Sequence, residues 1–224
     1  MVNDAGLMPQ PRNHEMIVSE CANHGRYIMT DLILNPTSTA QWLALVSESE
    51  AVTGCRLDED TESYLVFLLM RHTGQDQLTA QVVGRDFLEG LNLPLHSRQQ
   101  QLQDVGDHCL LFSGLFPQQA ARRRVSLSYF VDLGRAAYLE IADGCQTARS
   151  GLKGMFSQLS HEFVALMDVL QGMRTIGGQP GLQPIEAYDL WNDTGSKQAY
   201  EVLNQTGNHS TAIYSGPSAK GRIH

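Results

Sequence analysis

The stretch SGLKGMFSQLSHEFVALMDVLQGMR, residues 150–174, repeats apolar side chains at intervals of three and four. Its apolar members are Leu152, Met155, Phe156, Leu159, Phe163, Leu166, Met167, Leu170 and Met173. Side chains spaced in this way lie on one face of a helix, because an α-helix has about 3.6 residues per turn. The stretch contains no proline. It therefore predicts one long helix over 150–174 with a continuous buried face.

Shorter stretches before this one carry the same spacing and clear end signals. Ser38 or Thr39 and Gly54 bound the first of them, since serine and threonine cap helix starts and glycine follows helix ends. Four more helices are expected over 58–74, 76–91, 97–116 and 126–142. The alternation typical of β-strands does not recur between residues 38 and 174. The sequence thus predicts an all-α, single-domain bundle of about six main helices.

One of these helices is apolar on every side, from Tyr64 to Met70. A helix without a polar face is typical of the centre of a bundle, so we expect the helix over 58–74 to lie there. The side chains expected to be most buried are Phe67, Leu68, Phe112, Phe130, Phe163 and Leu166.

The pattern of the chain outside the bundle is weaker. Residues 1–37 form a less regular N-terminal segment before the helical core of 38–174. Three glycines and a proline mark residues 175–183 as a linker. A short helical extension is expected over 184–204, and residues 205–224, which lack an apolar period, are expected to form a flexible tail.

Composition excludes several classes of protein. The 224 residues include 16 basic and 24 acidic side chains, a formal charge of −8, which disfavours a protein that binds nucleic acid through its phosphates. The longest apolar run has seven residues, whereas a membrane-spanning helix needs about 20. No secretory signal opens the chain, and the four cysteines form no C-x-x-C pair. We expect a cytoplasmic protein with neither nucleic-acid nor membrane partners.

The strongest candidate for chemistry is the cluster of Asp104, Asp107 and His108. Asp104 and His108 are four residues apart, so they face the same way on a helix and are suited to share a metal ion. The alternative is a partly exposed, hydrogen-bonded pair. No Glu-x-x-His occurs, which argues against a di-iron bundle, and the motifs of nucleotide-binding loops and serine hydrolases are absent. No catalytic residue or cofactor is identified.

A second polar cluster is predicted to be structural. Asp132 and Arg135 are three residues apart in an apolar helix, with Gly134 between them. Small residues on this helix and on the one over 97–116 favour close packing of the two. Arg135 is then expected to reach Asp104 or Asp107 across the contact, and a buried pair of this kind fixes the register of two helices.

Three stretches resemble segments of an uncharacterised all-helical family that is widespread in proteobacteria: LDEDTESYLVFLLMRH, LQDVGDHCLLFSGLFP and VSLSYFVDLGRAAY. The resemblance covers about residues 38–172. It implies a bacterial cytoplasmic setting, and it transfers no activity, cofactor or catalytic residue.

These observations favour a non-enzymatic helical protein that acts through protein–protein contacts, either self-association or a regulatory or adaptor partner. Tyr188, Trp191 and Tyr200 make the extension too apolar for a freely solvated segment. It is expected to cover a surface of its own bundle or of a partner chain, and the glycine-rich linker favours the partner.

The alternative function is a metal- or small-molecule-dependent enzyme. Its polar pocket would lie between the helices over 97–116 and 126–142. The side chains available to line it are Asp104, Asp107, His108, Asp132 and Arg135.

Overall fold

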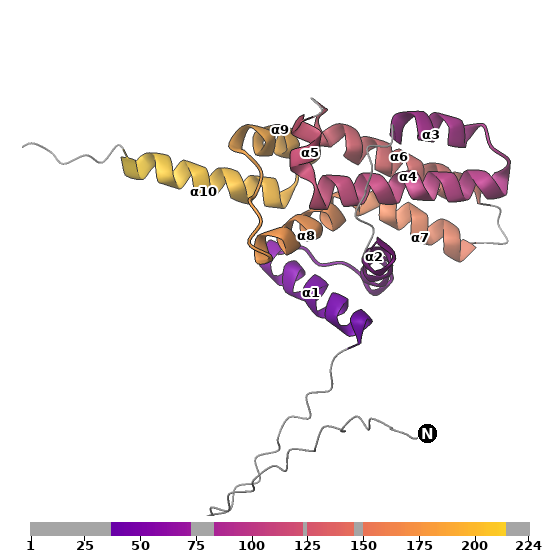
Figure 1. Cartoon of the computed structure of the whole chain (residues 1–224), viewed down its shortest axis with the longest axis horizontal. Helices are drawn as coiled ribbons and strands as arrows, with labels where there is room; N and C mark the ends of the chain where they lie inside the picture. Colours follow the sequence, from indigo (N-terminus) through magenta and orange to yellow (C-terminus); the bar gives the residue numbers. More distant parts are fainter. Residues whose placement is uncertain (1–36, 73–82, 123–124, 146–149, 214–224) are drawn as a thin grey trace, which may run out of the picture. The chain divides into compact units, whose positions relative to one another are not determined.

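The protein is described by a computed structural model that covers residues 37–72, 83–122, 125–145 and 150–213, with the backbone alone for 121–122 and 207–213. All regular structure in these ranges is helical, which confirms the all-α prediction for them (Figure 1). The described residues belong to one compact unit. None of their helices is both long and apolar enough to cross a membrane. Residues 1–36 and 214–224, parts of the predicted N-terminal segment and tail, lie outside the described residues.

Ten helices follow one another along the described ranges. They are α1 (Ser38–Thr53), α2 (Glu59–His72), α3 (Val83–Leu91), α4 (Leu95–Leu115), α5 (Pro117–Arg122), α6 (Leu127–Gly144), α7 (Ser150–His161), α8 (Phe163–Ile176), α9 (Pro184–Thr194) and α10 (Lys197–Ile213).

Local chemistry explains where helices begin and end. The hydroxyl of Thr37, rather than Ser38 or Thr39, caps α1 by accepting a hydrogen bond from Ala40 N at 3.3 Å. Gly54 ends the helix with a φ of 60°, a left-handed conformation that glycine adopts without steric strain.

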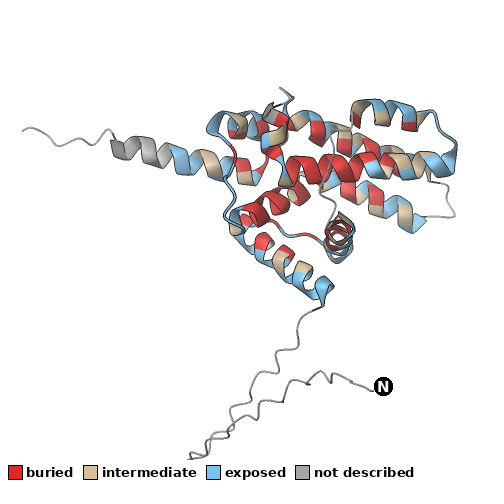
Figure 2. Cartoon of the chain, viewed as in Figure 1, coloured by how far each residue is buried: buried red, intermediate tan, exposed pale blue. Residues whose placement is uncertain are grey.

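The central helix is α4, not α2 as the sequence suggested. Every residue from Val105 to Gly114 is buried, and α4 packs on α3, α6 and α8 (Figures 1 and 2). Helix α2 packs instead on α1 and α7 and keeps one face toward solvent. Phe67 lies on that face and is 63% exposed, so the prediction that it is buried was wrong. The sequence could not show which face of α2 meets solvent, because the apolar run of residues 64–70 surrounds the helix.

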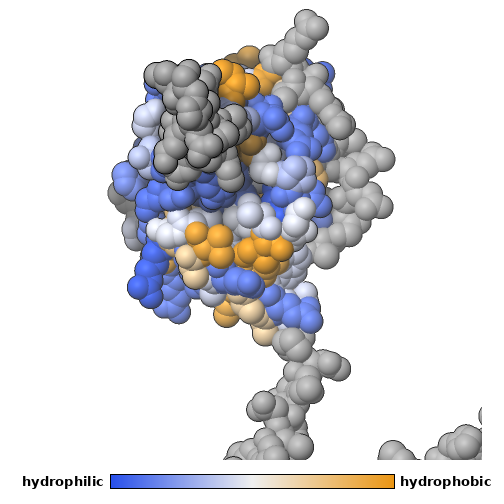
Figure 3. Space-filling model, turned by 90° about the vertical axis from the view of Figure 1, so that its left-hand side faces the viewer, coloured by the Kyte–Doolittle hydropathy of each residue, from blue (hydrophilic) through white to orange (hydrophobic). Residues whose placement is uncertain are grey.

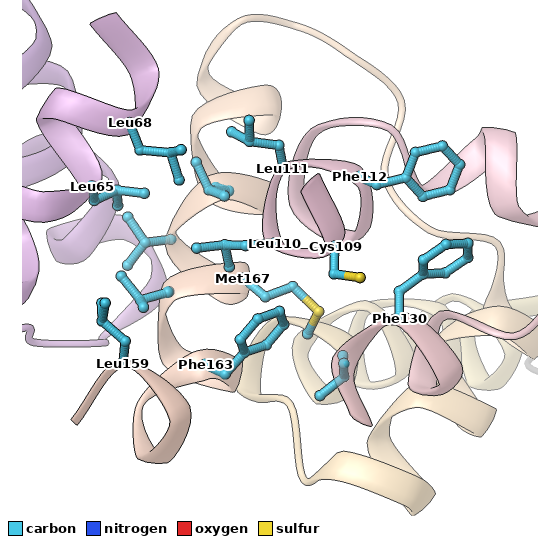
Figure 4. Packing of buried hydrophobic residues seen from close by; sticks show 14 of the residues in the cluster. Leu65, Leu68, Cys109, Leu110, Leu111, Phe112, Phe130, Leu159, Phe163 and Met167 are labelled. Carbon is cyan, nitrogen blue, oxygen red and sulfur yellow. The ribbon is translucent and has the colours of Figure 1, made fainter. Parts of the chain in front are cut away.

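The other expected core side chains are buried. Phe112 of α4 and Phe130 of α6 face each other with ring centroids 4.6 Å apart (Figure 4). Leu68, Phe163 and Leu166 are also buried, as predicted.

Close approach of α4 and α6 depends on glycine. A Cβ at Gly106 would lie 2.5 Å from the Tyr138 ring, and one at Gly134 would overlap the Phe163 ring. Real Cβ atoms do not tolerate such contacts, so hydrogen is the only side chain that fits at these two positions. The predicted tight packing of these two helices is therefore present.

The long helix expected over 150–174 is two helices. Glu162, with φ −89° and ψ 8°, separates α7 from α8. Leu159 and Phe163 are still four residues apart and both buried, so the apolar spacing continues across the break. Spacing alone could not reveal it.

The C-terminal extension packs on its own bundle. Ala187 and Leu190 of α9 and Ala199 of α10 are fully buried or nearly so, and these helices contact α6 and α8. The extension therefore covers its own bundle through these small and apolar side chains, while Tyr188, Trp191 and Tyr200 remain partly exposed, and contact of these rings with a partner chain stays a prediction. Helix α10 also continues to Ile213, beyond the predicted end at Asn204 (Figure 1).

Candidate functional site

A buried carboxylate connects three helices at the centre of the bundle. Asp107 of α4 is 1% exposed. Its Oδ1 accepts hydrogen bonds from Tyr64 Oη of α2 at 2.5 Å and from Tyr138 Oη of α6 at 2.7 Å. Its Oδ2 accepts from the Arg71 guanidinium of α2. Three donors therefore surround the one carboxylate.

The tyrosines reach Asp107 for reasons visible in the sequence. Gly106 leaves room for the Tyr138 ring to lie on α4, which brings its hydroxyl to the neighbouring residue. The Tyr64 and Tyr138 rings meet edge to face, with centroids 6.3 Å apart. A buried tyrosine hydroxyl needs a polar partner. Tyrosines within otherwise apolar helix faces are therefore the sequence signal that could have indicated a buried acceptor such as Asp107.

The electrostatics of this cluster suit a structural role. Burial raises the pKa of Asp107, while the hydrogen bonds from Tyr64 and Tyr138 and the charge of Arg71 act in the opposite direction. Burial and the neighbouring carboxylate raise the pKa values of both tyrosines, so at neutral pH both hydroxyls remain donors. Burial outweighs these donors, so the pKa of Asp107 stays above its usual value, and a carboxylate already held by three donors of its own chain is poorly placed to bind a metal ion.

The predicted metal ligands are not assembled into one site. Asp104 is exposed, and both oxygens of Asp107 already accept hydrogen bonds from its own chain. His108 stacks on Phe112 with ring centroids 6.2 Å apart. In the part of the chain that the structure describes, no three histidine, cysteine or acidic side chains are grouped to hold a metal ion.

Arg135 does not make its predicted contact. It is exposed, and its Nε donates to Ser160 O at 3.2 Å, while Ser160 Oγ donates to Arg135 O at 3.0 Å. Asp132 is also exposed. Arg135 thus connects α6 to α7, and Tyr138, three residues further along, connects α6 to α4. The contact with Asp104 or Asp107 was a wrong prediction because periodicity did not show which neighbour each flank of α6 meets.

A second candidate lies on the outer face of α9 and α10. Tyr188, Trp191 and Tyr200, here called the aromatic row, are 51%, 39% and 47% exposed. Ring centroids are 6.4 Å apart between Tyr188 and Trp191, and 5.7 Å apart between Trp191 and Tyr200. Trp191 is therefore the middle ring of a continuous exposed group.

The helices that carry the aromatic row are acidic. Glu186, Asp189, Asp193 and Glu201 belong to α9 and the first turns of α10, and Lys197 is the cation among them. The Lys197 ammonium donates to Gly54 O at 3.2 Å. The helices that carry the row therefore have a net negative charge over these residues.

A buried aspartate holds this region in place. Asp168 of α8, 1% exposed, accepts from Ser196 Oγ at 2.6 Å and from Lys197 N at 2.8 Å. Ser196 Oγ also accepts from Ala199 N at 3.0 Å and so caps α10. The start of α10, and with it Tyr200, is fixed to the bundle.

Comparison with known proteins assigns no activity, since the chain matches no protein-family model, no curated protein and no solved structure. The residues that the structure brings together carry the functional argument instead. Sequence reasoning identified Tyr188, Trp191 and Tyr200, but it did not identify Asp168 or Ser196 as the residues that hold them in place.

Proposed function

We propose that this chain is a protein-binding module whose aromatic row receives a cationic segment of a partner polypeptide. The observation that carries the proposal is the exposure of three adjoining rings on helices whose opposite face is buried. Tyrosine and tryptophan are enriched in protein interfaces, where they supply large contact areas with few rotatable bonds. Figure 3 shows one face of the molecule, on which apolar side chains lie in separate patches among hydrophilic ones.

Charge supports a cationic partner. Arginine and lysine bind favourably over tyrosine and tryptophan rings, and the helices that carry the row expose the acidic side chains Asp189 and Glu201, each next in sequence to a ring of the row. A second copy placed across a two-fold axis would bring the same acidic set against itself, which disfavours self-association through this face. The same charges repel nucleic-acid phosphates.

The competing proposal is an enzyme with a polar pocket between α4 and α6. Two of its five residues point elsewhere, since Arg135 binds Ser160 and Asp132 is exposed. Asp107 accepts from three donors of its own chain. Binding through the aromatic row has the better geometric support.

Trp191 fluorescence tests this proposal. Trp42, the other tryptophan, is replaced by phenylalanine, and the full chain is titrated with a Gly-Arg repeat peptide and with its neutral counterpart, in which citrulline replaces arginine. We expect the arginine peptide to change Trp191 emission saturably at low salt, and to bind at least about tenfold more tightly than the citrulline peptide.

Control variants separate specific binding from general attraction to an acidic protein. Tyr200→Ala should weaken binding of the arginine peptide, whereas Phe67→Ala, which removes an exposed ring on α2, should not. Equal affinity for the two peptides, equal affinity of the Tyr200→Ala variant, or tighter binding of single-stranded DNA would overturn the proposal.

A further inference from the structure

Arg174 is a buried cation without a carboxylate partner among the described residues. It lies in the last turn of α8 and is 9% exposed. Its guanidinium donates one hydrogen bond, from Nη2 to Pro180 O at 2.9 Å. Arg71 and Arg98, by contrast, pair with Asp107 and Glu140. Burial lowers the pKa of Arg174, and no charge on a described side chain offsets that effect.

An isolated buried charge is unfavourable unless something compensates it. The Pro180 carbonyl and the negative end of the α8 dipole compensate Arg174 in part. A guanidinium has five N–H donors, and one of them is used here. Its remaining capacity suits an anion that is not part of the described chain.

Arg174 lines a cavity of about 380 Å³ where the end of α4, the start of α5 and the segment after α8 meet. The other lining residues are Leu115, Phe116, Gln118, Gln119 and Gln179. Among the residues that the structure describes, the lining thus combines one cation, three neutral amides and two apolar side chains, without an acidic residue. Its volume falls in the range of about 300–1,000 Å³ that is typical of small-molecule sites.

We propose that this cavity binds a small organic carboxylate, anchored by the Arg174 guanidinium. The planar guanidinium matches the two oxygens of a carboxylate, and this paired geometry is stronger and more specific than a single hydrogen bond. Leu115 and Phe116 contact the carbon part of the ligand, and the glutamine amides serve its remaining polar atoms. A single cation beside apolar walls favours a singly charged carboxylate over a doubly charged phosphate.

This site is separate from the aromatic row and does not depend on it. None of the cavity-lining residues belongs to α9 or α10. If Arg174 served only to fix the segment after α8 through Pro180, its replacement would lower stability and would not change the binding of any anion.

The test is an NMR titration of the ¹⁵N-labelled full chain with benzoate, benzamide and inorganic phosphate. Benzoate and benzamide share a ring and differ in charge, so they isolate the contribution of the guanidinium. We expect benzoate to shift the amide signals of Leu115, Gln119 and Gln179 saturably, and benzamide and phosphate to bind at least about tenfold more weakly.

Two variants complete the test. Arg174→Gln should abolish the benzoate shifts, whereas Arg98→Gln, which removes an arginine already paired with Glu140, should leave them unchanged. If Arg174→Gln does not fold, Arg174→Lys retains a cation without the planar geometry and should weaken benzoate measurably. The inference is overturned if benzamide or phosphate binds as well as benzoate, if the Arg174 variants bind like the parent chain, or if benzoate produces no saturable shifts.

Discussion

Two buried aspartates hold two different regions of the molecule together. Asp107 and Asp168 are each 1% exposed, and each accepts a short hydrogen bond from a hydroxyl, at 2.7 Å from Tyr138 and at 2.6 Å from Ser196. Asp107 also has a counter-ion, Arg71, and connects helices far apart in sequence. Asp168 has the backbone N–H at the start of α10 instead. The hydrogen bonds to Asp107 stabilise the interior, and those to Asp168 fix the start of α10 and the surface that it carries.

The two regions differ in what they leave unpaired. At the junction of α2, α4 and α6, the carboxylate of Asp107 meets donors from its own chain. At the end formed by α8, α9 and α10, the aromatic row faces solvent and Arg174 lacks a carboxylate partner within the described ranges. Groups that the fold does not satisfy internally are the natural sites of recognition. This contrast supports the proposal that binding belongs to the second region, while the first region stabilises the fold.

Asp107→Ala should have the largest effect. The change removes the acceptor of the Tyr64 and Tyr138 hydroxyls, at about 1–3 kcal/mol for each buried donor left unpaired, whereas Arg71, 47% exposed, can turn to water. Urea unfolding followed by circular dichroism measures the loss. Asp104→Ala, three residues away and exposed, is the matched control and should change the free energy of unfolding by less than about 0.5 kcal/mol. Similar losses for both variants would show that Asp107 does not hold the interior together.

Asp168→Ala should have a smaller and more local effect. It leaves the Ser196 hydroxyl and the Lys197 N–H without their acceptor, a loss of about 1–3 kcal/mol. Hydrogen exchange should then accelerate in α9 and α10 while the amides of α4 remain protected, since local opening follows local contacts. Uniform acceleration through α4 would mean that the two regions unfold as one unit and that Asp168 does not act locally.

Helix content was predictable because it depends on local signals. The cap at the start of α1 and the glycine at its end act within a few residues, and the spacing of Phe112 and Phe130 placed both in the core. The break at Glu162 was not predictable, because Leu159 and Phe163 keep the helical spacing on either side of it.

The polar contacts were predictable only in part. The sequence singled out Asp107 as a candidate metal ligand and Arg135 as a buried contact between helices, but the partners of both were set by packing. Asp107 meets Tyr64, 43 residues away, and Tyr138, 31 residues away. Periodicity assigns a residue to a helix face and does not specify which helix lies opposite. The sequence singled out the three rings of the aromatic row but predicted that they cover a surface, whereas the structure leaves each of them partly exposed.

Tyr200→Ala should barely change stability. Its ring is 47% exposed, and surface substitutions of this kind usually change the free energy of unfolding by less than about 0.5 kcal/mol. Loss of the stacking on Trp191 adds to this, so we expect a total loss below about 1 kcal/mol. Together with weaker binding of the arginine peptide, this small loss would separate recognition from stability at the second region. A loss above about 2 kcal/mol would make the ring part of the fold and not part of a binding surface.

The smallest effect concerns the pH dependence contributed by Asp168. Burial raises the pKa of this carboxyl above its usual 3.8, and the hydrogen bonds from Ser196 and Lys197 offset only part of that rise. Between 3.8 and the raised value, the folded chain binds more protons than the unfolded chain, so stability decreases as pH rises through this window.

Asp168→Asn removes this titration and keeps one of the two acceptor oxygens, while its amide NH2 replaces the other; this lost bond is a constant offset, so the change with pH still reports the titration. The variant should therefore gain stability relative to the parent chain as pH is raised from about 4 toward neutral, where the parent must keep a buried charge. Thermal unfolding of both proteins at a series of pH values measures the difference, and contributions from all other groups cancel in it. Parallel curves across the series would mean that the Asp168 carboxylate is as well stabilised in the folded chain as in water, and that the start of α10 compensates its burial completely.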